Sequence, residues 1–157
     1  MIIGVSGHQD LPASAQAHAE KRIRALLAEQ AAPVTGVGSL AEGADQLFAQ
    51  LVLAAGGSLH VVIPSRGYET TFAVEARCLY RELLARADTV TELDFPEPGE
   101  QAYYAAGHHV AECCDLLVAV WDGQPARGLG GTADAVAHAR ELGRDVMIVW
   151  PEGVRRT

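Results

Sequence analysis

Residues 116–121, LLVAVW, and the segment 122–140, DGQPARGLGGTADAVAHAR, decide the fold of this chain. The first six side chains are all apolar, as in a strand that helices cover on both faces of a sheet. Glycines then lead into a helical pattern that begins near Ala133. A buried strand followed by a turn and a helix is the repeating unit of a parallel α/β sheet.

The same alternation of strand and helix recurs along the whole chain. Apolar runs predict strands over 2–6, 33–37, 59–64, 89–93, 116–121 and 146–150. Amphipathic patterns predict helices over 13–30, 42–55, 73–87, 101–114 and 133–142. We therefore expect an α/β fold, namely a doubly wound, mostly parallel sheet with helices on both faces, in a single domain over residues 1–157.

Composition limits the classes of protein that this chain can belong to. Its 157 residues are 49% hydrophobic and 20% charged, which fits one globular domain. The net charge of −8 disfavours binding to a phosphate backbone or to an anionic membrane surface, so we expect neither nucleic acid nor membrane as a partner. The three cysteines, two of them adjacent, do not suggest a disulfide framework. No apolar segment resembles a signal peptide or a membrane-spanning helix. We expect a cytoplasmic protein.

The glycine-rich turn after the fifth predicted strand is the strongest functional signal. Gly128, Gly130, Gly131 and Thr132 precede a helix, where free N–H groups and the helix dipole favour a phosphate. A plain turn with Thr132 as the helix N-cap is the alternative.

Asp122 and Gly123 end the same strand. Asp122 is placed to accept hydrogen bonds from ribose hydroxyls or a base, or else to cap the turn before Gly123.

Three other loops also follow predicted strands, and in a parallel sheet such loops meet at one edge. In each loop a ligand contact competes with a structural role: a histidine bonded to nearby backbone, acids that favour a helix dipole, or aromatic residues that pack the loop down. The candidates are Ser6, Gly7 and His8 in the first loop, Gly38, Ser39, Glu42 and Asp45 in the second, and Arg66, Tyr68 and Phe72 in the third.

Several familiar motifs are missing from the sequence. It contains no GxxxxGK[ST] loop, no GxGxxG fingerprint and no GxSxG elbow. His109 and Cys113 are one helical turn apart, but no second pair supplies the remaining ligands of a zinc site. We expect no cofactor and no bound metal.

Three segments together resemble the SLOG superfamily, the Rossmann-like domains related to the DNA-processing protein DprA and to LOG phosphoribohydrolases. They are GVSGHQDL at 4–11, GVGSLAEGADQLFA at 36–49 and CDLLVAVWDGQPARGLGGTADAVAHAR at 114–140. The resemblance implies a homodimeric sensor or carrier of a nucleotide or of a nucleotide-derived molecule such as ADP-ribose. The contacts it implies are Ser6, Gly7, His8, Gly38, Ser39, Asp45, Gly130, Gly131, Thr132 and Asp134.

The alternative is an N-glycoside hydrolase or transferase, of phosphoribohydrolase or deoxyribosyltransferase type, that acts on nucleoside monophosphates. The LOG motif PGGxGTxxE places a glutamate where this chain has Ala135, and the arginine of the preceding helix has no counterpart in 101–114. Asp122 and Asp134 remain as candidate catalytic residues, although Asp134 lies about 100° away from Ala135 around the helix. These departures favour binding without turnover. A third possibility is a vestigial crevice in a subunit of an assembly.

Overall fold

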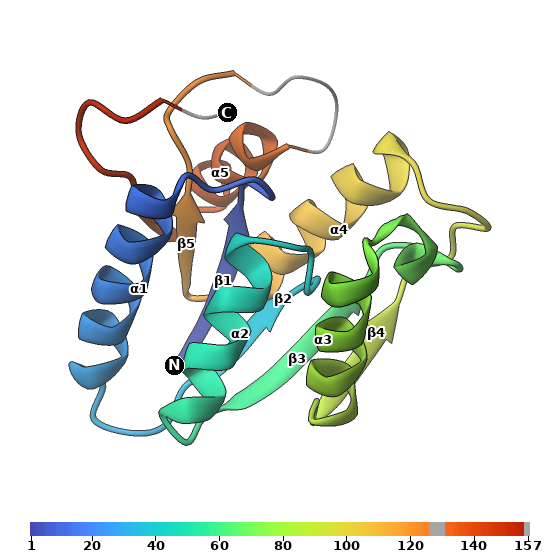
Figure 1. The fold of residues 1–157 in the computed structure, drawn as a ribbon, viewed down its shortest axis with the longest axis horizontal. Coiled ribbons are helices and arrows are strands. Elements are labelled where there is room, and N and C mark those ends of the chain that lie inside the picture. The colour runs from blue at the N-terminus through green and yellow to red at the C-terminus, as the bar shows by residue number, and fades with distance from the viewer. Residues whose placement is uncertain (126–130, 156–157) are drawn as a thin grey trace.

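A computed structural model describes residues 1–125 and 131–155. Six parallel strands form one sheet in the order β4-β3-β2-β1-β5-β6 (Figure 1). The strands are β1 (Ile2–Gly7), β2 (Thr35–Gly38), β3 (Ser58–Ile63), β4 (Thr89–Glu92), β5 (Leu116–Val120) and β6 (Asp145–Ile148). All six were predicted, with ends that differ by no more than two residues.

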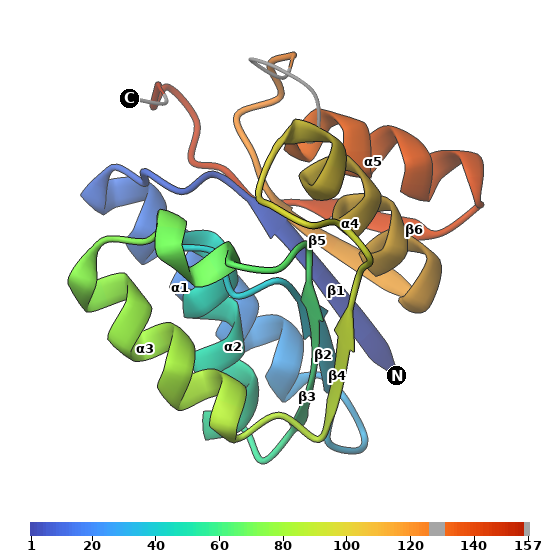
Figure 2. The same ribbon diagram turned by 90° about the vertical axis from the view of Figure 1, so that its right-hand side faces the viewer.

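Helices cover both faces of this sheet, which confirms the doubly wound α/β fold (Figure 2). On one face lie α1 (Ala13–Ala28), α2 (Ala44–Ala54) and α3 (Val74–Ala85), and on the other lie α4 (Glu100–Cys113) and α5 (Thr132–Glu141). The short 3₁₀ helix η1 (Tyr68–Thr71) was not predicted. Among the described residues, no helix is long and apolar enough to cross a membrane.

The hydrophobic core has one layer on each face of the sheet. Alternate side chains of a strand point to opposite faces, so a strand covered twice is apolar at nearly every position. In β5, Val118 and Val120 pack with Phe48 of α2, whereas Leu117 and Ala119 belong to the opposite layer with α4 and α5. This arrangement explains the continuous apolar run in the sequence.

The strand order reverses between β1 and β5. After the edge strand β4 the chain returns through α4 to β5, which pairs with β1 from Ile3–Leu116 to Gly7–Val120. The helices that follow β1 and β5 then leave toward opposite faces (Figure 2). Such a switch point opens a crevice at the carboxyl ends of the two strands.

The close approach of the β1 loop to the start of α2 should make any side chain at Gly43 destabilising. Gly43 has φ +88°, and a Cβ atom there would lie 2.2 Å from the Gln9 carbonyl oxygen. We expect Gly43→Ala to lower the free energy of unfolding by about 2–3 kcal/mol, from backbone strain plus overpacking. Gly56→Ala is the matched control, since Gly56 has φ +81° with nothing within 4 Å. Equal losses in urea denaturation would show that the close approach contributes nothing.

Candidate functional site

A cleft of about 650 Å³ lies at the carboxyl ends of β1, β2, β3 and β5. Loops after these strands form it, and α4 supplies a further wall. The structure thereby brings together predicted contact residues from four separate loops. They are Ser6, Gly7, His8, Ser39, Asp45, Tyr68, Gly131 and Thr132, together with Glu42 and Phe72.

Asp45 is the most deeply buried carboxylate of the cleft, with 8% of its surface exposed. It lies in the first turn of α2, and its Oδ2 accepts hydrogen bonds from the backbone N–H of Ser39 (3.3 Å) and of Ala41 (3.4 Å). Its Oδ1 accepts none from the described residues. Burial outweighs these two bonds and raises the pKa of Asp45 to about 7. A carboxyl group that titrates near neutrality inside a cleft is a candidate functional group.

Tyr68 places a buried hydroxyl beside Asp45. Its ring packs edge to face against Phe72 (4.9 Å between centroids) and Tyr103 (6.2 Å), and the residue is 6% exposed. Burial, with the charge of Asp45 as a smaller cause, raises the pKa of Tyr68 well above its usual value. Tyr68 and Phe72 thus pack the third loop and also line the cleft, and their contact with a ligand stays a prediction.

The N-terminus of α5 forms the opposite end of the cleft. Gly131, rather than Thr132, is the N-cap residue, and no side-chain cap is described there. The Ser6 hydroxyl donates to Thr132 Oγ1 (3.1 Å), which joins β1 to α5. Gly131, Thr132 and Ala133 line the cleft, where the first turn of a helix has N–H groups without intrahelical acceptors. Gly128 and Gly130 lie outside the described residues.

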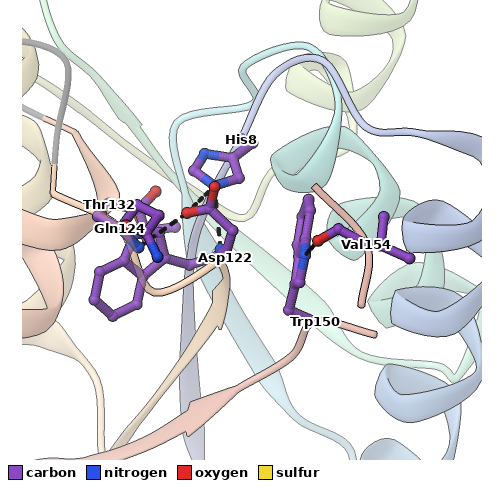
Figure 3. Close-up of polar contacts among 8 residues, drawn as sticks. His8, Asp122, Gln124, Thr132, Trp150 and Val154 are labelled. Atoms are coloured by element: carbon purple, nitrogen blue, oxygen red, sulfur yellow. Dashed lines mark hydrogen bonds and ion pairs between the residues drawn. The ribbon is translucent and has the colours of Figure 1, made fainter. Parts of the chain in front are cut away.

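His8 and Asp122 meet beside this end of the cleft (Figure 3). His8 Nε2 lies 3.3 Å from both the backbone N and the Oδ1 of Asp122, and the His8 ring packs edge-on against Trp150. Asp122 Oδ1 also accepts a hydrogen bond from the Gln124 N–H (3.0 Å). Asp122 therefore has the turn-capping role, and it is not among the residues that line the cleft.

Four other predicted contacts also lie off the cleft lining. Arg66 is exposed and paired with Asp94 (3.5 Å), and a Cβ at Gly38 would lie 2.7 Å from Val5 Cγ1, so that glycine serves packing. Gly123 and Asp134 are the other two. Both predicted catalytic candidates, Asp122 and Asp134, are thus outside the lining.

Ala135, at the position of the LOG glutamate, is buried between α5 and α4. It is 2% exposed, and a Cβ at Gly107 would lie 3.6 Å from its methyl group.

Sequence reasoning missed the wall that α4 contributes. Glu100, Tyr103 and Gly107 lie on one face of this helix and line the cleft. Their spacing places them on one face of a helix, but only the strand order shows that this face borders the crevice at the switch point.

The lining is acidic. Carboxylates come from Asp10, Glu42, Asp45 and Glu100, and no described lysine or arginine lines the cleft. Over residues 1–125 and 131–155, no group of three or more His, Cys, Asp or Glu is arranged to hold a metal ion.

Solved structures share this fold at low sequence identity. DprA from Streptococcus pneumoniae has a TM-score of 0.68 at 21% identity over 93% of this chain and 49% of its own. DprA from Helicobacter pylori has a TM-score of 0.67 at 14% identity over 94% of this chain and 64% of its own. The molybdenum cofactor carrier protein from Chlamydomonas reinhardtii has a TM-score of 0.59 at 19% identity, over 94% of this chain and 74% of its own. This chain thus spans about half of the first protein and less than two thirds of the second.

No protein-family model and no curated protein matches the sequence. The structural likeness nevertheless corrects one expectation. Nucleic acid was excluded as a partner on net charge, yet the H. pylori DprA, whose fold covers 94% of this chain, binds single-stranded DNA. The exclusion was wrong because net charge averages over the whole surface and says nothing of one local face. The chain has the Rossmann-like fold of the two DprA proteins and of the carrier protein, which is the fold that its sequence predicted.

Proposed function

We propose that this protein binds a nucleotide, or a nucleotide-derived molecule such as ADP-ribose, in the switch-point cleft and acts as a sensor or carrier. One observation carries the proposal: the cleft joins a helix N-terminus without a described side-chain cap to buried polar groups at its other end. The first feature suits a phosphate, and the second suits a sugar or a base.

Each part of the cleft has a role in this proposal. The N–H groups at Gly131–Ala133 would hold the phosphate, and Thr132 would add a hydroxyl. Asp45 would accept hydrogen bonds from sugar hydroxyls, while the rings of Tyr68 and Tyr103 would contact the base. A carrier of similar fold, the Chlamydomonas molybdenum cofactor carrier protein, supports binding without turnover.

A thermal-shift screen tests this proposal. The panel holds nucleosides, nucleotides, ADP-ribose derivatives and a single-stranded oligonucleotide, with every product checked by chromatography. A ligand that stabilises the protein and is recovered unchanged supports a sensor or carrier. Stabilisation by the oligonucleotide alone would favour the DNA-binding role of DprA, and consumption of a ligand would favour the hydrolase. If no compound changes the melting temperature, the result would favour a vestigial crevice without a ligand. Light scattering on the same sample measures the predicted homodimer.

The phosphate end of the cleft can be tested separately. We expect Gly131→Asp to weaken AMP binding by about tenfold or more while changing adenosine binding little, because a carboxylate would block and repel the phosphate. Ala137→Asp adds the same charge on the exposed side of α5 and serves as the control. Isothermal titration calorimetry measures both. Unchanged AMP affinity in a folded Gly131→Asp protein would exclude this end as the phosphate site.

A further inference from the structure

The acidic wall of the cleft comes from three separate segments. Asp10 follows β1, Glu42 precedes α2 and Asp45 lies in its first turn, and Glu100 begins α4. No described lysine or arginine balances these groups in the lining. Helices α2 and α4 also begin at the cleft, but each has a lining carboxylate in its first turn, Asp45 and Glu100. The first turn of α5 contributes no carboxylate to the lining, so its N-terminus favours an anion, whereas the acidic wall repels negative charge.

Two deeply buried polar groups have unused hydrogen-bonding capacity. Asp45 directs both of its described bonds to Oδ2, and the Tyr68 hydroxyl makes none with the described residues. Asp45 is 8% exposed and Tyr68 is 6% exposed. Both side chains line the cleft, and no fully buried side-chain oxygen or nitrogen of the described residues lacks a partner. The free capacity is therefore directed at the cleft, where it suits a ligand that donates hydrogen bonds or carries positive charge.

Aromatic rings accompany the carboxylates. Tyr68, Phe72 and Tyr103 pack together, and Trp121 lines the cleft beyond β5. Aromatic faces attract cations, most strongly where water is excluded. Carboxylates beside aromatic faces form the environment in which a flat, positively charged ring is most stable.

We propose that the cleft selects nucleosides whose base is a positively charged heteroaromatic ring, such as a pyridinium or an N-methylated purine, over the same nucleosides with a neutral base. The inference rests on the proposed function and specifies the ligand of that site. A phosphate, where present, would lie at the α5 end, away from the carboxylates.

Asp45 links this selectivity to pH. Its pKa of about 7 means that a cation in the cleft favours the ionised carboxylate and expels a proton. The other titratable groups that line the cleft are His8, Asp10, Glu42, Glu100, Tyr68 and Tyr103. We expect binding of a permanently charged ring to tighten as the pH rises from 6 to 8.

The experiment compares pairs that differ in the charge of the base. Calorimetry at pH 7.5 measures nicotinamide riboside against its reduced, uncharged form, and 1-methyladenosine, cationic at this pH, against adenosine. We expect the charged member of each pair to bind about tenfold more tightly, as a partly desolvated cation–π contact beside carboxylates allows. Equal binding, or tighter binding of the neutral members, would overturn the inference.

Two variants assign the preference to the acidic wall. Glu42→Gln removes an exposed lining carboxylate and should reduce the charged-to-neutral ratio severalfold. Glu29→Gln removes an exposed carboxylate at the far end of α1 and should leave that ratio unchanged. If both variants keep the full charged-to-neutral affinity ratio, the acidic wall is not the cause of the preference. If the pairs bind equally, only the charge preference fails, whereas the absence of binding by any nucleoside or nucleotide would refute the proposed function as well.

Discussion

Asp45→Asn should stabilise the protein at pH 8 and leave its stability nearly unchanged at pH 4. An unfolded aspartate titrates at about 3.8, whereas Asp45 in the folded protein titrates at about 7. Between these values the folded state holds more protons than the unfolded state, so this group makes stability fall as the pH rises. A shift of this size corresponds to roughly 4 kcal/mol as an upper bound. Asparagine keeps an oxygen for the Ser39 and Ala41 N–H groups and cannot ionise.

The measurement is urea denaturation of both proteins from pH 4 to pH 8. Other groups change the stability of wild type and variant alike, so the difference between the two isolates Asp45. We expect this difference to grow through the interval between 3.8 and 7 and to level off above it. Glu42→Gln, an exposed acid of the same loop, is the control and should show a small difference. A difference that does not change with pH would contradict the raised pKa.

A buried acid with a raised pKa that lines a cleft is a candidate functional group. The position of this loop was predictable from the sequence. Residues 36–45 lead from an apolar strand into a helix, and a parallel sheet brings all such loops to one edge. Both acids of this segment line the cleft, but which of them is buried, Asp45 rather than the exposed Glu42, depends on packing that no local pattern encodes.

The third loop shows the limit of sequence reasoning most clearly. Arg66 and Tyr68 were equivalent candidates, but Gly67 adopts φ +67° and turns the chain between them. Arg66 then faces solvent and Asp94, whereas Tyr68 enters the core beside Asp45. A glycine shows that such a turn is permitted, not which neighbour points inward.

The contribution of α4 could not be predicted because it depends on strand order. Six apolar runs establish that strands exist, but they do not show that β5 inserts beside β1 rather than beyond β4. Only the insertion brings Glu100 and Tyr103 across the switch point.

Purified protein should release little or no free base from AMP or from cytokinin-type nucleoside monophosphates. Cleavage of an N-glycosidic bond requires a carboxylate at the oxocarbenium-like centre. At the LOG position this chain has Ala135, whose methyl group is buried against α4 and carries no charge. Loss of one general acid or base costs about 100- to 10,000-fold in rate.

The neighbouring helix offers no replacement, since α4 contains no arginine to orient a carboxylate or a phosphate. The described carboxylates that line the cleft come from the loops after β1 and β2, from the first turn of α2 and from α4, not from α5. Binding should persist, because the α5 N-terminus acts through backbone N–H groups that these substitutions leave intact. Chromatography of AMP incubated with the protein measures the release. Release at ordinary enzymatic rates that Asp45→Asn, Asp122→Asn or Asp134→Asn abolishes would identify the protein as an N-glycoside hydrolase and name the carboxylate that replaces the missing glutamate.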